Sequence, residues 1–151
     1  MKVLFAASAG GHLDEITNLQ KIADKHELLL LTEKTDCRIT GIYQRVFLVP
    51  QVNRKEWKCA LKLLVNFIVS YRLLCEQKPK VVVSIGALAT IPVCILARFM
   101  GIKVIYIESF ARTETPSRTG KLLYNVANHT VVQWQELLKY YPDAVYGGSI
   151  Y

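Results

Sequence analysis

The segment that decides the fold is Lys80-Val81-Val82-Val83-Ser84-Ile85-Gly86, which precedes an apolar helical stretch at Thr90–Met100 and a second apolar run at Lys103–Ile107. Three consecutive valines favour a β-strand. Pro92 falls in the first turn of the expected helix, where proline is tolerated, and Gly101 suits the position just after the helix end. The segment therefore predicts a strand, a helix and a strand in succession, which is typical of parallel sheets.

The same alternation extends along the chain in both directions. Apolar runs predict further strands, and amphipathic stretches predict helices between them. The further expected strands are Lys2–Ala7, Glu27–Thr32, Arg45–Pro50 and His129–Val132, and the further expected helices are His12–Lys25, Lys55–Gln77, Ser117–Ala127 and Gln133–Tyr140. Because the strands are apolar on both faces, we expect an α/β fold, a Rossmann-like doubly wound parallel sheet, in one domain spanning residues 1–151.

The composition excludes several classes of protein. Of the 151 residues, 52% are hydrophobic and 21% are charged, which excludes a disordered or fibrous chain. The formal net charge of +7 favours an anionic partner. The basic residues are not interleaved with a base-stacking platform, so we expect no nucleic acid. The four cysteines, Cys37 among them, form no Cys-x-x-Cys pair and no cluster with histidine, so we expect reduced thiols and no metal site.

A glycine-rich turn, Ser8-Ala9-Gly10-Gly11-His12, joins the first expected strand to the first expected helix. Gly10 and Gly11 allow a ligand to approach the backbone at a helix N-terminus, which favours negative charge. His12 stands at the crevice expected at the carboxyl ends of the strands, where a neutral imidazole can act as a general base. The alternatives are a turn that only requires glycine and a histidine that only caps the helix. Because the turn has neither a dinucleotide fingerprint nor a P-loop, we expect no cofactor.

Two further loops belong to the same expected crevice. Ser84 and Gly86 lie in the turn after the fourth expected strand, and Glu108, Ser109 and Arg112 follow the fifth. Arg118 lies in the same loop as Arg112. A carboxylate, hydroxyls and two guanidinium groups suit a ligand rich in hydroxyl and phosphate groups. The alternatives are a purely structural turn and a solvated loop with a local ion pair.

The expected helix Lys55–Gln77, with Asn53 as its N-cap, is apolar on two sides. We expect the broader row to pack on the sheet, and this row comprises Trp57, Leu61, Leu64, Phe67, Ile68, Tyr71 and Leu74. The opposite row would then contact an anionic membrane surface, and it comprises Val65, Val69 and Leu73, flanked by Lys55, Lys58, Lys62 and Arg72. The alternative is a crowded core helix with snorkelling lysines. We expect no transmembrane helix.

Four segments in a fixed order resemble the asparagine-linked-glycosylation-fourteen-like family, the membrane-side subunits of two-part UDP-sugar glycosyltransferases. These segments are Ala7–His12, Lys78–Gly86, Gly101–Ser109 and Tyr141–Gly148. Bacterial members of this family serve capsule and exopolysaccharide assembly. The chain is also similar to the N-terminal half of the murein enzyme that adds N-acetylglucosamine to lipid I.

The resemblance implies the N-terminal half of a GT-B glycosyltransferase that is split between two polypeptides. A partner subunit would carry the UDP-sugar site, and this chain would bind a polyprenyl-diphosphate-linked sugar as a peripheral protein on the cytoplasmic, inner face of the cell membrane. His12 is then the expected base of an inverting transfer, with the two loops above in contact with the acceptor. Two other functions stay open: a non-catalytic activator that anchors a separate glycosyltransferase, and a self-sufficient Rossmann enzyme.

Overall fold

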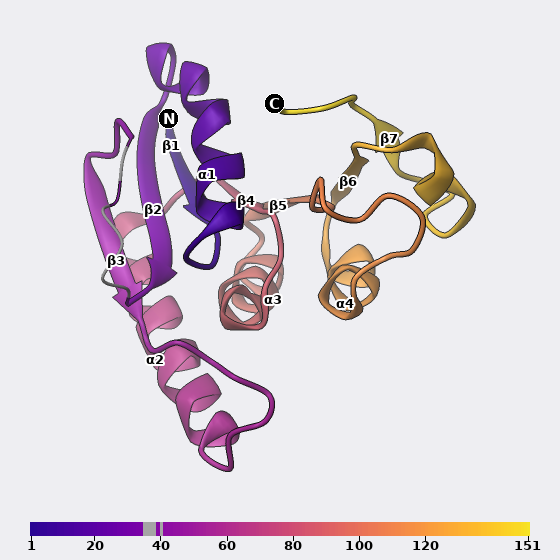
Figure 1. The fold of residues 1–151 in the computed structure, drawn as a ribbon. Helices are drawn as coiled ribbons and strands as arrows, with labels where there is room; N and C mark the ends of the chain where they lie inside the picture. Colours follow the sequence, from indigo (N-terminus) through magenta and orange to yellow (C-terminus); the bar gives the residue numbers. More distant parts are fainter. Residues whose placement is uncertain (35–38, 40) are drawn as a thin grey trace.

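The computed structural model describes residues 1–34, 39 and 41–151, and its centre is a seven-stranded sheet (Figure 1). All neighbouring strands are parallel, in the order β3-β2-β1-β4-β5-β6-β7. The strands are β1 (Lys2–Ala6), β2 (Glu27–Glu33), β3 (Arg45–Val49), β4 (Val81–Ser84), β5 (Lys103–Ile107), β6 (His129–Val132) and β7 (Val145–Tyr146). The order changes direction between β1 and β4, which is the position where such sheets bind ligands.

Helices cover both faces of the sheet, so the predicted doubly wound fold is confirmed (Figure 1). One face carries α2 (Cys59–Gln77), α3 (Ile91–Phe99) and α4 (Arg118–Val126), and the other carries α1 (Gly11–Thr17) and the 3-10 helix η1 (Asn18–Asp24). Alternate side chains of β1 point to the two faces: Leu4 belongs to the core under α2–α4, and Phe5 to the core under α1. Both are fully buried, and each such side chain contributes about 1.5–3 kcal/mol of burial free energy.

Several local predictions are correct and others are not. Pro92 does lie in the first turn of α3, and Gly101 follows the helix with a φ of 74°. The expected helix at 12–25 is α-helical only as far as Thr17, and the expected helix at 133–140 is the short 3-10 helix η3 (Gln135–Lys139). Helix η3 begins two residues later than expected, because Trp134 has an extended backbone and its indole N–H donates to Phe110 O at 2.8 Å. Strand β7 was not predicted, because two residues carry no periodic signal.

The cysteines that the structure describes are free thiols: Cys59 and Cys75 are partly exposed, and Cys94 is buried under the sheet. Burial raises the pKa of the Cys94 thiol to about 12. The thiol is therefore neutral and inert at physiological pH, as a packed core group. The prediction for Cys37 falls outside the described residues.

Helix α2 begins at Cys59 rather than Lys55, and Asn53 is not its N-cap. The Asn53 side chain instead accepts a hydrogen bond from Lys55 N at 3.0 Å, which closes a local turn ahead of the helix. The helix ends at Gln77, its C-cap Lys78 has a left-handed φ of 50°, and Pro79 follows. The segment 53–58 is thus a loop, and it leads from the carboxyl end of β3 to the start of α2.

The prediction of which side of α2 packs on the sheet is wrong for most of the broader row, although Leu74 of that row is buried as predicted. The buried row consists of Asn66, Ser70, Leu73, Leu74 and Gln77, which follow one another at helical spacing. Leu73 is 2% exposed and Val69 packs against the same core, so these two residues are not surface contacts. The error arose because three of the five buried residues are polar. The Asn66 side chain, for example, donates to Pro50 O at 3.3 Å.

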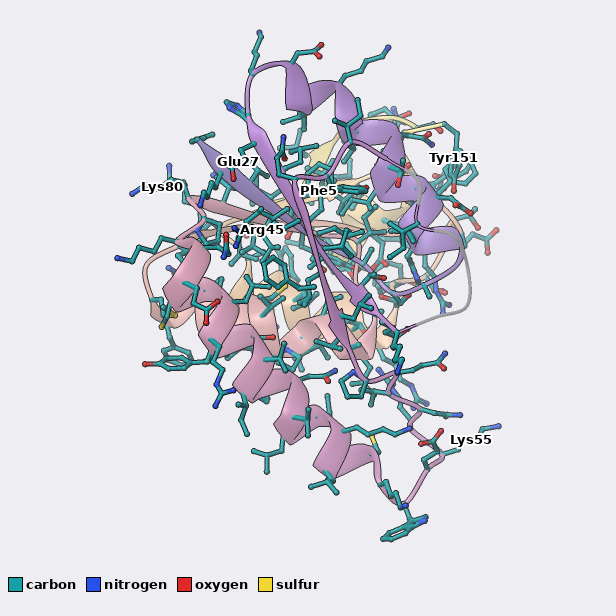
Figure 2. All side chains as sticks on the ribbon, turned by 90° about the vertical axis from the view of Figure 1, so that its left-hand side faces the viewer. Phe5, Glu27, Arg45, Lys55, Lys80 and Tyr151 are labelled. Atoms are coloured by element: carbon teal, nitrogen blue, oxygen red, sulfur yellow. The ribbon has the colours of Figure 1, made fainter. Side chains whose placement is uncertain are left out.

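The opposite side of α2 is apolar and faces outward. We call it the outer row, and it consists of Leu61, Leu64, Ile68 and Tyr71 of the helix together with Trp57 of the preceding loop, which are between 49% and 88% exposed. Val65 lies at its margin and is 37% exposed. Figure 2 shows α2 along the edge of the molecule, with the side chains of its outer side pointing away from the sheet. No helix in the described part of the chain combines the length and apolarity needed to cross a membrane.

Candidate functional site

A cleft of about 610 Å³ lies at the carboxyl ends of the central strands. Its walls come from α1, the loop after β3, the turn after β4, the loop after β5 and the start of α4. The residues around it are His12, Arg54, Ile85, Ala87, Glu108, Ser109, Ala111, Arg112, Pro116, Ser117, Arg118, Thr119 and Lys121. The crevice expected from the strand ends is therefore present, and it contains His12, Glu108, Ser109, Arg112 and Arg118, which the sequence places there.

His12 is the second residue of α1 and lies half-buried at the cleft. Its Nδ1 is 2.9 Å from the hydroxyl of Ser8, which lies four residues earlier in the turn before α1. In the tautomer in which Nδ1–H donates to Ser8 Oγ, Nε2 carries the lone pair. Such an imidazole can accept a proton from a hydroxyl group bound in the cleft.

Gly10 and Gly11 leave the backbone beside His12 open. Gly10 caps α1 with a φ of 86°, and its carbonyl accepts from Leu13 N at 2.8 Å. A Cβ atom added to either glycine would meet no heavy atom within 4 Å. A ligand can therefore reach the main chain at the start of α1, as the glycine-rich turn predicts.

Ser84 and Gly86 do not reach the cleft, contrary to the prediction that they contact the ligand. Ser84 is fully buried, where its hydroxyl lies 3.1 Å from Thr90 Oγ1 and accepts from Gly86 N at 3.1 Å. These bonds hold the turn between β4 and η2 (Leu88–Thr90). The cleft is lined instead by Ile85 and Ala87.

Ala87 has an unusual backbone, with φ 82° and ψ 148°. Residues other than glycine rarely adopt this region of backbone conformation, and doing so costs about 1–3 kcal/mol. The conformation turns the chain sharply from β4 into the helix and places Ala87 in the wall of the cleft. The surrounding buried bonds of Ser84 and Thr90 maintain it.

Glu108 borders the cleft, but its carboxylate is fully occupied by internal donors. It accepts from Tyr106 Oη at 2.8 Å, from Tyr141 Oη at 2.6 Å, and from the backbone N–H groups of Ser109 and Ser117 at 3.2 Å each. Four donors match the lone-pair capacity of a carboxylate, so Glu108 fixes the loop after β5 rather than binding a ligand. Burial and the nearby carboxylate raise the pKa of both tyrosines above the ordinary value, which keeps their hydroxyls protonated.

A second buried carboxylate, Glu15 of α1, was not predicted. It is 2% exposed and accepts from Ser109 Oγ at 3.2 Å, from Phe110 N at 2.8 Å and from the side-chain amide of Gln133. Gln133 also donates to Glu108 O at 3.0 Å and accepts from Ile150 N at 3.0 Å. These bonds connect α1 to the loops after β5 and β6. The only sign in the sequence is a carboxylate between Leu13 and Ile16 on the apolar side of the helix.

A smaller hollow of about 430 Å³ lies on the other side of His12, which borders both cavities. Phe110 borders it, and its ring centroid lies 5.0 Å from that of Trp134 and 5.2 Å from that of Tyr151. Tyr151 also borders the hollow. The residues at the end of the described chain therefore lie against the site.

The cleft carries a strong excess of positive charge. Arg54, Arg112, Arg118 and Lys121 surround it, and Glu108 is the acidic residue at its border. Arg54 and Lys121 were not assigned to the site from the sequence. The signal for Arg54 is its place just after the third expected strand, and the signal for Lys121 is its spacing of three residues from Arg118 on an expected helix.

Solved structures with this arrangement of elements include MurG from Acinetobacter baumannii, with a TM-score of 0.69 and 20% identity over 87% of this chain and 40% of that one. UDP-N-acetylglucosamine 2-epimerase from Rickettsia bellii gives a TM-score of 0.76 and 14% identity, over 99% of this chain and 45% of that one. The chain spans less than half the length of each. Its fold is therefore the Rossmann-like N-terminal half of the GT-B architecture.

A family model described as "Oligosaccharide biosynthesis protein Alg14 like" matches residues 32–150, and the chain belongs to this family. The human UDP-N-acetylglucosamine transferase subunit ALG14 is 27% identical over 99% of this chain and 83% of its own length. The subunit of the same name from Yarrowia lipolytica is 29% identical over 99% of this chain and 68% of its own length. An N-acetylglucosamine transferase from Myxococcus xanthus that acts on a pyrophosphoryl-undecaprenol substrate is 30% identical, over 95% of this chain and 40% of its own. The resemblance found in the sequence is thus confirmed.

Proposed function

We propose that this chain is the acceptor-binding half of a two-component inverting glycosyltransferase. It would bind a polyprenyl-diphosphate-linked sugar, while a partner subunit carries the UDP-sugar, in the assembly of a cell-surface polysaccharide such as a capsule or exopolysaccharide. The observation that carries this proposal is His12, oriented by Ser8 at the mouth of a cationic cleft. Membership of the Alg14-like family, whose relatives are named transferase subunits, supports it.

The transfer would proceed by a single displacement. His12 Nε2 takes the proton from the acceptor hydroxyl as its oxygen attacks the anomeric carbon, and the bond to the UDP oxygen breaks. The reaction needs the tautomer in which Nδ1–H donates to Ser8 Oγ, and the 2.9 Å contact between these two atoms would hold the ring in that form. UDP leaves with the electron pair, and the configuration at the anomeric carbon is inverted.

The test is sugar transfer by the assembled pair. The chain and its partner are purified separately, and transfer from UDP-N-acetylglucosamine to a short polyprenyl-diphosphate-linked sugar is measured for each alone and for the mixture. We expect turnover from the mixture and none from this chain by itself. Robust turnover by this chain alone would contradict the two-component proposal.

Within that pair, His12→Ala should lower kcat by about 10²–10⁴-fold while partner binding survives, because the loss of a general base has an effect of this size. His12→Asn should not restore the rate, since an amide does not accept the proton. The matched control is His129→Ala, an exposed histidine at the opposite, amino end of β6. Near-wild-type turnover by His12→Ala would instead favour the activator function, in which the chain only anchors the catalytic partner.

We further propose that the outer row of α2 holds the protein on the cytoplasmic face of the cell membrane. The row presents five exposed apolar side chains, and Lys55, Lys58, Lys62 and Arg72 belong to the same segment of the chain, with Lys62 paired to Glu56. Each inserted side chain contributes up to about 1.5–3 kcal/mol, and each basic residue near an anionic surface adds about 1 kcal/mol. This sum supports reversible attachment that weakens as salt is added.

The membrane proposal is tested by co-sedimentation with phosphatidylglycerol-containing vesicles at low and high salt. Leu64→Glu and Ile68→Glu should abolish sedimentation without unfolding the protein, because both side chains point outward. Leu122→Glu, at an exposed apolar position of α4, is the matched control and should sediment like the wild type. If all three variants sediment equally, the membrane contact is not on α2.

A further inference from the structure

We infer that Arg54, Arg118 and Lys121 form a binding subsite for a diphosphate group, on the side of the cleft formed by α4. The assignment of this group to the lipid-linked acceptor rests on the function proposed above. The anion site itself is independent of that function, because it is inferred from the positions and charges of the three side chains. The sequence places Arg118 at the expected crevice, whereas it assigns no ligand contact to Arg54 or Lys121.

The tertiary structure brings the three cations together from two separate segments. Arg54 lies in the loop between β3 and α2, and its Nη2 donates to Thr119 Oγ1 at 3.3 Å, across 65 residues of sequence. That bond fixes the guanidinium beside the first turn of α4. Arg118 is the first residue of the helix, and Lys121 lies one turn further on, so their side chains share the wall with Arg54.

The charges of this cluster are not compensated within the described residues. The ion pairs found there are Lys2–Glu27 and Lys62–Glu56, and neither lies at the cleft. The carboxylate at the border of the cleft, Glu108, is occupied by two tyrosine hydroxyls and two backbone N–H groups. Like charges held together repel one another, and a bound polyanion relieves that repulsion.

The arrangement fits a diphosphate better than a single carboxylate. Two guanidinium groups offer planar pairs of donors that match phosphate oxygens, and the ammonium group of Lys121 adds a third charge. The amino end of α4 favours negative charge at the same wall, where Ser117 and Thr119 also border the cleft. A diphosphate with two negative charges would be bound by all three side chains.

Two substrates of such a transferase carry a diphosphate: the lipid-linked acceptor and the UDP-sugar. The position of Arg54 favours the lipid. Trp57, the first residue of the outer row, is three residues further along the same loop, which places the anion subsite next to the apolar surface. A lipid whose chain lies in the membrane at α2 would present its diphosphate to Arg54 and α4.

The anion site is tested on the full chain with inorganic pyrophosphate, by isothermal titration at low salt. We expect the double variant Arg54→Ala/Arg118→Ala to weaken binding at least tenfold, and Lys121→Glu to do the same by charge reversal. Arg98→Ala, an exposed arginine in the last turn of α3, should bind like the wild type. All these side chains are exposed, so the thermal midpoint should be unchanged. Equal binding by wild type and both cleft variants would overturn the site.

The source of the diphosphate is tested with farnesyl diphosphate and UDP as separate probes, and then with the assembled pair. The double variant should lose affinity for farnesyl diphosphate and raise KM for the lipid-linked acceptor about tenfold or more, with KM for the UDP-sugar unchanged. A rise in KM for the UDP-sugar alone would overturn the assignment to the acceptor. If the pair transfers no sugar at all, the proposed function fails, while the pyrophosphate and farnesyl diphosphate titrations still decide the subsite.

Discussion

Gly120 offers a stringent test of the buried cluster around Glu108. It is the third residue of α4, and its N–H donates to Ser117 Oγ at 2.8 Å. A methyl group at this position would lie 2.5 Å from Tyr141 Oη, 2.6 Å from Tyr106 Oη and closer still to Glu108 Oε2. No side chain heavier than hydrogen fits there unless α4 moves or the cluster breaks.

The magnitude for Gly120→Ala follows from these contacts. Displacing one donor from the Glu108 carboxylate costs about 1.5–3 kcal/mol, and the strain of overpacking adds about 1–3 kcal/mol. Alanine returns about 1 kcal/mol, because it favours helix over glycine. We expect a net loss of about 2–5 kcal/mol in the free energy of unfolding, which corresponds to a drop of about 5–15 °C in Tm.

The assay is urea and thermal denaturation followed by circular dichroism. Gly11→Ala is the matched control: it is the same substitution at the start of α1, where the new methyl group meets nothing within 4 Å. It should change stability by less than about 1 kcal/mol. If Gly120→Ala unfolds within about 0.5 kcal/mol of the wild type, the close packing of Glu108 and the two tyrosines on α4 is refuted.

Three further predictions concern the rest of the fold. Ala87→Gly should raise the free energy of unfolding by about 1 kcal/mol, because glycine relieves the backbone strain, and a lower urea midpoint would contradict this. Leu73→Ala should lower the free energy of unfolding by about 2–5 kcal/mol, and Leu64→Ser by less than about 0.5 kcal/mol, as measured by thermal denaturation. If Leu64→Ser were the more destabilising of the two, the reported orientation of α2 would be contradicted. Burial raises the pKa of Cys94 in the folded protein to about 12, above its value of about 9 in the unfolded chain. The stabilising contribution of the neutral thiol is therefore fully present below pH 9. Between pH 9 and pH 12 the free energy of unfolding falls by about 1.4 kcal/mol for each pH unit. Urea midpoints between pH 9 and pH 10 should therefore fall less steeply in Cys94→Ala, and equal slopes would show that the thiol is not so buried.

The strands could be predicted from the sequence alone, because a buried parallel strand is apolar on both faces and is recognised without knowing which strands lie beside it. Six strands were predicted close to their observed bounds, and so were the helices α3 and α4. The orientation of α2 was not predictable in this way, because a helix that is apolar on two sides has no unique periodicity. Its buried side is defined by tertiary contacts, such as that of Asn66 with Pro50 O.

The candidate site was likewise predictable in part, in its loops but not in the directions of its side chains. The loops at the cleft were predicted, since the carboxyl ends of parallel strands share one edge of the sheet. The directions of the side chains were not, because they depend on partners distant in sequence. Glu108 turns inward to Tyr141, 33 residues away, and Arg54 reaches α4 across 65 residues.

The buried carboxylate of Glu15 also has a consequence for the order in which the molecule folds during synthesis. All three of its partners belong to the last third of the chain, and Gln133 follows it by 118 residues. Until those residues have been translated, docking α1 on the sheet would bury an unpaired charge, which is strongly unfavourable. At about 5–20 residues per second, the ribosome needs roughly 6–24 s to supply them. We therefore expect α1 and its glycine-rich turn to remain loose on the nascent chain and to settle only after β5 and β6 have joined the sheet.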